Sequence, residues 1–216
     1  IGLGRMFGFR FPQNFNYPYI AASITDFWRR WHMTLGSWFR DYVYFPMGGS
    51  RCGKGKMVFN LVVVWLLTGL WHGEGVNFLL WGAILGLLII MEKLWYGKYL
   101  QKLPVLGHIY LVILIPLSWV VFAITDPGQL GTYFCRLFPL LGNGGVAVNA
   151  QDIVKYLQGY GGLLAIGIVL CIPAVFDFYE KHKKNPVVIL MLFVLFWISI
   201  YFVSSTAGNP FMYLNF

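Results

Sequence analysis

Apolar residues form four long runs along the chain, and short polar or charged segments separate them. A helix needs roughly 20 consecutive apolar residues to cross a bilayer, so these runs predict membrane-spanning or nearly spanning helices. The runs are Met57–Trp71 with Val76–Met91, divided by His72-Gly73-Glu74-Gly75; Val105–Ile124, broken by Pro116; Gly162–Phe176, with Pro173 near its end; and Val187–Ser204. The pattern predicts an all-α fold, a multi-pass transmembrane helical bundle with broken or re-entrant helices.

The first arm of the divided run is short for a membrane span. Met57–Trp71 has about 15 residues, which rise about 22 Å at 1.5 Å per residue. We expect this arm to end inside the bilayer, where non-helical backbone is tolerated only if it is buried in protein or lines a cavity.

His72 stands at the end of this arm and is a candidate for chemistry at membrane depth. Leu61, Trp65, Thr68 and His72 are spaced to share one helical face, and the glycines at 69 and 73 leave room beside it. An ionisable side chain at this depth is costly and is a functional candidate by default. A neutral imidazole can act there as a general base. The other interpretation is a histidine that is hydrogen-bonded inside the bundle or exposed at the far surface.

Residues 23–46 carry the period of an amphipathic helix. Ser23-Ile-Thr-Asp26 has the form of a capping box, which marks a helix start. At about 100° per residue, one arc collects large apolar side chains. These are Phe27, Trp28, Trp31, Leu35, Trp38, Phe39 and Tyr42. The pattern predicts an interfacial helix with this face in lipid or protein. His32 lies at the edge of the arc, and residue types alone favour an anchor in which it is incidental.

Composition excludes several classes of protein. Of the 216 residues, 58% are hydrophobic, 19% are aromatic and 11% are charged. A disordered chain would be rich in charge, and an ordinary soluble domain has roughly a quarter of its residues charged. The net charge of +8 therefore indicates contact with the anionic surface of a lipid bilayer rather than with nucleic acid. The three cysteines have no metal-type spacing, and no metal site is expected.

The basic residues predict a topology. Fourteen of the sixteen lie in residues 1–56 or in the 93–104 and 177–186 loops, and two lie in the 126–160 loop. The positive-inside rule therefore places residues 1–56 and both Lys-rich loops in the cytoplasm. We expect a single membrane domain over residues 1–216, with residues 1–56 cytoplasmic or interfacial and residues 57–216 forming transmembrane helices.

The segment Gly48-Gly-Ser-Arg-Cys-Gly-Lys-Gly-Lys56 is rich in glycine and basic residues. It approaches the phosphate-binding pattern G-x-x-x-x-G-K-[ST], but Gly55 stands where the hydroxyl residue should be, and the segment follows a helix pattern rather than a strand. A flexible basic loop is the simpler interpretation. Contact with anionic lipid or with the phosphates of an acyl donor is the functional alternative.

Several strings together resemble one family. They are Ile1-Gly-Leu-Gly with Phe7-Gly-Phe-Arg-Phe-Pro-Gln-Asn-Phe-Asn-Tyr-Pro-Tyr19, Phe27-Trp-Arg-Arg-Trp-His-Met-Thr-Leu35, Trp38-Phe-Arg-Asp-Tyr42, Pro46-Met-Gly-Gly-Ser-Arg51, Gly69-Leu-Trp-His-Gly73, Asn77-Phe78 with Trp81-Gly82, and Asn209-Pro-Phe-Met-Tyr-Leu-Asn-Phe216. In this order they resemble the membrane-bound O-acyltransferase (MBOAT) family, and within it the branch of alginate O-acetyltransferase membrane subunits. The resemblance runs from residue 1 to 216. It implies that the chain is the C-terminal part of such a protein.

The resemblance also implies functional residues. His72 matches the catalytic histidine of the family, and His32 matches a second histidine on the cytoplasmic side of a tunnel through the membrane. The D-alanyl-transferring relatives share both histidines. Glu74 departs from the family, in which an alanine is more common, and we have no physical account of this substitution.

The resulting hypothesis is an O-acyltransferase of the bacterial inner or plasma membrane. It would move an acetyl group from a cytoplasmic donor such as acetyl-CoA toward an extracytoplasmic polysaccharide or cell-wall glycan, with an extracytoplasmic esterase-like transferase as partner and no permanently bound cofactor. His72 would act as base or acyl relay, and His32 would orient the donor or assist acid–base chemistry. Further substrate-binding candidates are Arg29, Arg30 and Arg40 for the donor phosphates, and Trp71 and Asn77 as cavity residues.

Two alternatives remain open from the sequence. One is transfer of D-alanine or another acyl group to wall polymers. The other is a secondary transporter or lipid-binding membrane protein, because broken helices and intramembrane ionisable groups also mark transporters. Apart from His72 and Glu74, the four runs carry almost no charge, so no proton-relay chain is visible.

Overall fold

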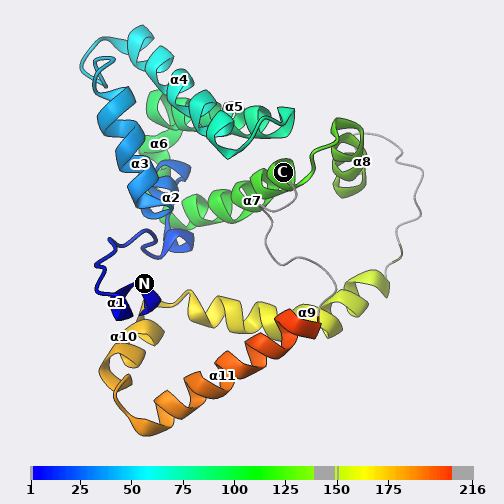
Figure 1. The fold of residues 1–216 in the computed structure, drawn as a ribbon. Coiled ribbons are helices and arrows are strands. Elements are labelled where there is room, and N and C mark those ends of the chain that lie inside the picture. Colours follow the sequence, from blue (N-terminus) through cyan, green and yellow to red (C-terminus); the bar gives the residue numbers. More distant parts are fainter. Residues whose placement is uncertain (1, 139–148, 150, 206–216) are drawn as a thin grey trace. The chain divides into compact units, whose positions relative to one another are not determined.

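The computed structural model describes residues 2–138, 149 and 151–205, and these residues form helices and connecting turns without any strand. They divide into two compact units, residues 1–148 and residues 149–216. Figure 1 shows the helices of both units. The closing segment Asn209–Phe216, part of the family resemblance, lies outside the described residues.

The first unit contains the helices that carry the candidate site residues. They are α1 (Gly2–Met6), η1 (Pro18–Ile20), α2 (Ile24–Arg30), α3 (Met33–Phe39), the π-helical turn η2 (Arg40–Tyr44), α4 (Lys54–His72), α5 (Val76–Met91), the π-helical turn η3 (Glu92–Tyr96), α6 (Gly97–Lys102), α7 (Pro104–Ala123) and α8 (Pro127–Leu137). The second unit contains α9 (Gln151–Leu170), α10 (Pro173–His182) and α11 (Pro186–Ser205).

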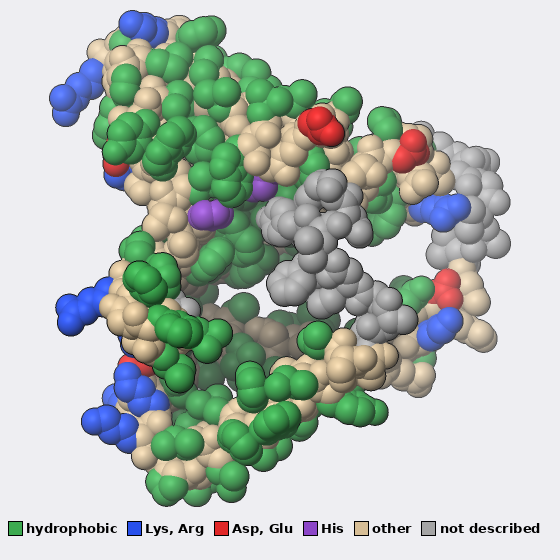
Figure 2. Space-filling model, in the orientation of Figure 1, with side chains coloured by type: hydrophobic (Ala, Val, Ile, Leu, Met, Phe, Trp, Pro, Cys, Tyr) green, Lys and Arg blue, Asp and Glu red, His purple; other side chains and the backbone are tan. Residues whose placement is uncertain are grey.

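Among the described residues, five helical segments are long and apolar enough to cross a membrane. They are α4, the continuous segment Val76–Lys102, α7, α9 and α11. Apolar side chains on α11 are exposed, and Figure 2 shows them over much of its visible surface. Such a surface suits a lipid environment. The helices of the described residues and their membrane-capable lengths confirm the all-α fold with multiple membrane-capable helices.

Two expectations about prolines are wrong. The predicted run Gly162–Phe176 is divided, because α9 already ends at Leu170 and Pro173 begins α10. Proline fits the first turn of a helix, where its missing N–H group has no intrahelical partner to lose. The run Val105–Ile124 is not broken, because α7 continues through Pro116. Apolar helices tolerate an internal proline when neighbouring groups compensate for its backbone effect.

The predicted single helix over residues 23–46 is also wrong. The segment forms α2, α3 and η2, with a break at Trp31 and His32. Ser23 does cap α2, since its side chain accepts from the N–H of Asp26. The aromatic arc divides accordingly, with Phe27 fully buried and Trp38 52% exposed. Helical periodicity alone could not reveal the break, because contacts from outside the segment hold it.

Helices α4 and α5 form a closely packed hairpin. A Cβ atom on Gly69 would lie 2.5 Å from the backbone oxygen of Phe78, and one on Gly82 would lie 2.4 Å from that of Trp65. These distances leave no room for a side chain, so the two glycines let the helix backbones approach each other. The space predicted beside the His72 face at Gly69 is therefore filled by α5.

The core of the first unit joins α2, α5 and α7. Phe27 from α2, Trp81 and Leu85 from α5, and Leu111 and Ile115 from α7 are essentially inaccessible to solvent. Several tryptophan rings meet in this core, including Trp28 and Trp81, whose centroids are 5.4 Å apart. This packing fixes α2 against the membrane-capable helices and thereby fixes the residues that follow it.

The Gly-rich segment is anchored to the start of α4. Asn60 is fully buried, and its amide donates to the backbone oxygens of Met47 and Gly49, each at 3.1 Å. The basic side chains of the Gly-rich segment, Arg51, Lys54 and Lys56, are exposed.

Candidate active site

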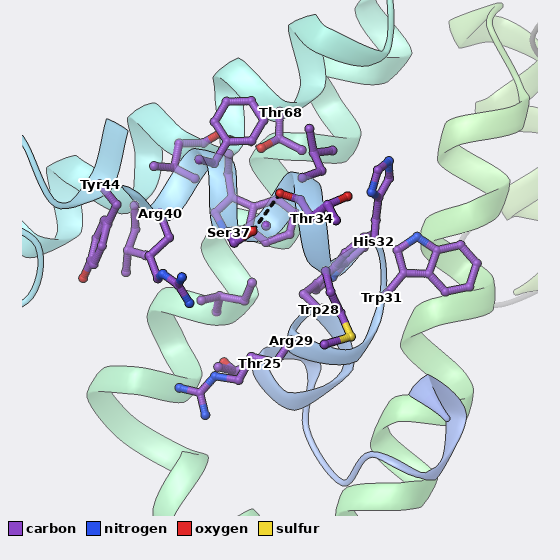
Figure 3. Close-up of a pocket in the computed structure, with 18 of the residues that line it drawn as sticks. Thr25, Trp28, Arg29, Trp31, His32, Thr34, Ser37, Arg40, Tyr44 and Thr68 are labelled. Atoms are coloured by element: carbon purple, nitrogen blue, oxygen red, sulfur yellow. Dashed lines mark hydrogen bonds between the residues drawn. The ribbon is translucent and has the colours of Figure 1, made fainter. Parts of the chain in front are cut away.

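A pocket of about 630 Å³ lies between α2, α3 and α4. It brings together four of the predicted site residues, namely Arg29, His32, Arg40 and His72. Figure 3 shows Arg40 and Tyr44 toward one side of it and His32 and Trp31 toward the other. The pocket therefore joins a cationic region to a region that holds both histidines.

One face of α4 forms a wall of this pocket. Leu61, Trp65, Thr68 and His72 all line it, which confirms that they share a helical face. His72 lies eleven positions after Leu61, so the wall extends about 16 Å along the helix axis. A wall of this length offers room for an extended chain of atoms.

His72 is held in a defined orientation by its own helix. Its Nδ1 atom lies 2.7 Å from the backbone oxygen of Thr68. A carbonyl oxygen can only accept, so Nδ1 carries the proton of this bond and Nε2 of the neutral ring carries the lone pair. The rings of Trp71, Trp81 and Phe122 surround the imidazole at centroid distances of 4.8, 4.9 and 5.3 Å. The arrangement leaves Nε2 as the atom able to accept a proton.

His32 occupies the break between α2 and α3. Its φ and ψ angles are 47° and 53°, a left-handed conformation that is uncommon for residues other than glycine. The Nδ1 atom is buried and has no hydrogen-bond partner within the described part of the chain. Burial lowers the pKa of the imidazole below its ordinary value of 6.5, so the neutral form is favoured.

Trp71 connects the two histidines without lining the pocket. Its ring makes edge contacts with His32 at 5.7 Å and with His72 at 4.8 Å between centroids. The indole is 56% exposed, and Trp71 is not among the pocket-lining residues.

The three predicted arginines have different surroundings. Arg29 lines the pocket and forms no ion pair with any described residue. Arg40 also lines it, with its Nε atom 2.8 Å from Asp41 and its guanidinium over the ring of Phe45. Arg30 lies outside the pocket, and its Nε atom donates to Asp26 at 2.9 Å. Arg29 is therefore the guanidinium most available to an anionic ligand.

Asn77 lies away from the pocket. It is 3% exposed, and its amide donates to the backbone oxygen of Phe122 at 2.7 Å. This bond ties the start of α5 to the end of α7. The structure thus gives Asn77 a contact that holds two helices together behind His72.

A second pocket of about 670 Å³ adjoins the first. The two share the lining residues Thr25, Arg29, Tyr44, Leu61 and Ile89. Lys93 and Lys98 also line the second pocket. Asp26 and Glu92 line it as well, so its lining carries both charges, and Arg29 stands between this pocket and the pocket that contains the histidines.

Sequence reasoning missed Glu92. This carboxylate is 5% exposed and accepts hydrogen bonds from the backbone N–H groups of Ile24 and Thr25 and from the Thr25 hydroxyl. It thereby satisfies the N-terminus of α2, the helix that carries Arg29 and leads to His32. Its only signal in the sequence is an acidic residue directly after an apolar run.

Sequence reasoning also missed Asn14. Its side-chain oxygen accepts from the backbone N–H and hydroxyl of Thr34, at 3.0 and 2.6 Å. The residue lies within the resemblance string 7–19, but nothing in the local pattern indicates a contact 20 positions away.

Comparison with known proteins identifies related sequences. The profile of the membrane-bound O-acyltransferase family matches residues 2–128, which include both histidines and both pockets. A probable alginate O-acetylase of Pseudomonas syringae pv. tomato is 45% identical over 191 residues, covering 86% of this chain and 36% of that protein.

Relatives with other names are also similar. A peptidoglycan O-acetyltransferase of Helicobacter pylori is 29% identical over 237 residues, covering 100% of this chain and 45% of that protein. A teichoic acid D-alanyltransferase of Bacillus subtilis is 36% identical over 110 residues, covering 46% of this chain and 28% of that protein. The chain spans less than half the length of each of these relatives.

Proposed function

The chain belongs to the membrane-bound O-acyltransferase family, and from this premise we propose that it carries the acyl-transfer site of a membrane-bound O-acetyltransferase. The observation that carries the proposal is the single pocket lined by His32, His72, Arg29 and Arg40. It combines a candidate base with cationic groups for an anionic donor. Related proteins named as O-acetylases or O-acetyltransferases support acetyl as the transferred group.

We propose that His72 acts through Nε2 as the general base. The acceptor hydroxyl gives its proton to Nε2 while its oxygen attacks the thioester carbonyl carbon of the donor. The bond between that carbon and sulfur then breaks, the ester forms, and the departing sulfur takes the proton from the imidazolium. His72 returns to its neutral form. The hydrogen bond from Nδ1 to Thr68 supports this role because it fixes the tautomer that leaves Nε2 free.

The donor we propose is an acyl thioester with phosphate groups, such as acetyl-CoA. The cationic side chains of Arg29, Lys93 and Lys98 in the lining of the second pocket support phosphate binding there. The two carboxylates that also line it are already engaged, Glu92 by the N-terminus of α2 and Asp26 by Arg30. The wall of α4 from Leu61 to His72 is long enough for the arm that joins phosphate to thioester. His32 would then orient the thioester end as a neutral imidazole.

The acceptor we propose is a polysaccharide or cell-wall glycan on the extracytoplasmic side of a bacterial inner or plasma membrane. The names of the alginate and peptidoglycan relatives support this class. The concentration of basic residues in 1–56 and in two loops supports a cytoplasmic donor side. An extracytoplasmic esterase-like transferase is the partner that would complete delivery.

The proposal is tested by measuring ester-linked acetate on exported glycan in the host, with membrane levels matched by immunoblot. We expect His72→Ala to lower the acetate at least about 100-fold, the size of a general-base contribution. The matched control is His182→Ala, because His182 makes the same bond to its own helix, at 2.8 Å to Phe178, on an exposed surface. This control should keep wild-type acetate.

Other outcomes would contradict the proposal. Unchanged acetate in His72→Ala would make His72 a packing residue. D-alanine ester in place of acetate would support an acyltransferase, but with D-alanine rather than acetyl as the transferred group. Accumulation of a solute driven by an ion gradient, without any ester, would indicate a transporter.

A further inference from the structure

The break at His32 needs support from outside its own segment. A non-glycine residue in the left-handed region is strained and persists only where the surroundings hold it. Ending α2 at Arg30 and starting α3 at Met33 also leaves backbone groups without helical partners. The residues that satisfy these groups are therefore the residues that hold His32 in place.

Residues 14–16, which we call the strap, bridge the break from both sides. The N–H of Asn16 donates to the backbone oxygen of Arg30 at 2.9 Å, at the end of α2. The backbone oxygen of Asn14 accepts from the N–H of Met33 at 2.9 Å, at the start of α3. His32 lies between these two attachment points.

The two bonds above involve only backbone atoms of the strap, whereas the Asn14 side chain adds contacts that a different residue would not make. Its oxygen accepts from both the N–H and the hydroxyl of Thr34, so it caps α3 two positions after His32. His32 itself makes no side-chain capping bond to α3. The strap also continues a wall of the site, because Pro12 and Gln13, which directly precede it, line the pocket.

We propose that Asn14 is a positioning residue that holds His32 at the acyl-transfer pocket by capping α3 across the break. This inference rests on the proposed function, since it gives His32 a task at that pocket. Within the described part of the chain the Asn14 side chain bonds to Thr34 and not to His72 or Arg29, so its effect should pass through the break and through His32.

The test combines acetate measurement with a readout that reports on His32 directly. The protein is purified from its host membrane and treated with diethyl pyrocarbonate, and the modification rate of each histidine is followed by mass spectrometry. Asn14→Ala should raise the rate at His32 about threefold or more, as expected for losing a capping hydrogen bond. The rate at His72 should not change, because α4 makes none of these contacts.

Two variants serve as matched controls. Asn14→Asp keeps a side-chain oxygen at the same place, so it should rescue both readouts. Asn16→Ala removes a side chain of the same type from the same strap, and this side chain makes no hydrogen bond within the described part of the chain. We expect Asn14→Ala to lower ester-linked acetate about tenfold, while the two controls stay near wild type.

Each result has a consequence. Unchanged labelling of His32 in Asn14→Ala would overturn the proposal, whether or not acetate falls. Failure of Asn14→Asp to rescue would also overturn it. If Asn14→Ala does not accumulate, Thr34→Val removes one of the two bonds, and it should raise His32 labelling in the same direction by a smaller factor. Wild-type acetate in His32→Ala would instead contradict the proposed role of His32 in acyl transfer. The labelling rate of His32 in Asn14→Ala would still test whether Asn14 positions it.

Discussion

The carboxylate of Glu92 accepts hydrogen bonds from both the backbone N–H and the hydroxyl of Thr25, although 67 positions separate the two residues in the sequence. Ile24 adds a third bond at 2.6 Å. A buried carboxylate is stable only when its oxygens are well satisfied, and an unsatisfied helix N-terminus is also costly. The N-terminus of α2 therefore satisfies the carboxylate, the carboxylate satisfies the helix N-terminus, and α2 is fixed to the end of α5.

The first prediction concerns this attachment. Glu92→Ala leaves two backbone N–H groups and one hydroxyl without their partner, so we expect a loss of about 3 kcal/mol in the free energy of unfolding. The measurement is the thermal unfolding midpoint of the purified protein in detergent, together with its membrane level. Glu180→Ala is the control, because Glu180 forms an exposed pair with Lys183 that contributes at most about 1 kcal/mol. Equal midpoints for the two variants would show that the Glu92 bonds do not matter.

The second prediction separates two neighbouring arginines. Arg29 lines both pockets without an ion pair among the described residues, whereas Arg30 lines neither pocket and is paired with Asp26. We expect Arg29→Ala to raise the KM for the acyl donor about tenfold or more, as for a lost charge-assisted hydrogen bond. Arg30→Ala should leave KM within about twofold, because Arg30 lines neither pocket and its partly exposed i,i+4 pair contributes little. A larger effect of Arg30 than of Arg29 would contradict the assignment of the donor side.

The sequence predicted much of the fold because a membrane-capable helix is recognisable from length and apolarity alone. The shared face of Leu61, Thr68 and His72 also followed from spacing, and it does line a pocket. Prolines were harder to interpret, since Pro116 lies inside a helix and Pro173 begins one. Residue type is the same in both cases, and only the packing around it differs.

The site could be predicted only in part, for a physical reason. A continuous helix over residues 23–46 places Arg29, Arg30 and Arg40 together on the outward side. The break at His32 changes the course of the chain, and it depends on contacts with Asn14 and with other distant residues. Neither Asn14 nor Glu92 has a local pattern that reveals its partner. The pairing of Arg30 with Asp26 is a local i,i+4 contact within α2, whereas the bonds of Asn14 and Glu92 join residues far apart in the sequence.

The third prediction is a pH dependence of stability that comes from His32. Burial places the pKa of its imidazole in the folded state below the ordinary value of 6.5 that it regains on unfolding. Below that value the unfolded state binds more protons than the folded state, so stability falls as the pH falls. The contribution is fully present above pH 6.5 and is lost as the pH decreases toward and through the lower pKa of the folded state.

The measurement is the thermal unfolding midpoint of wild type and His32→Gln between pH 8 and pH 5. The difference between the two proteins should be constant above about pH 6.5 and should change below it, with the wild type losing more stability. Using the difference removes the contribution of other titrating groups. Parallel curves over the whole range would mean that the imidazole of His32 titrates as it does in water.

The fourth prediction concerns the close approach of α4 and α5. A Cβ atom on Gly82 would lie 2.4 Å from the backbone oxygen of Trp65 and 3.3 Å from the Cα atom of Gly69. Backbone atoms cannot move aside as a flexible side chain can, so Gly82→Ala must separate the helices and should cost about 1–3 kcal/mol. Because His72 and Trp65 lie on the displaced helix, ester formation should fall as well.

Gly167→Ala is the matched control for this change, since a Cβ atom on Gly167 in α9 would meet no atom within 4 Å. Replacing glycine by alanine inside a helix is favourable by up to about 1 kcal/mol where space allows it. The thermal unfolding midpoint in detergent should therefore fall for Gly82→Ala and stay level or rise for Gly167→Ala. If Gly82→Ala kept the wild-type midpoint and activity, the two helices would have to be able to separate without cost, and the position of His72 would not depend on their contact.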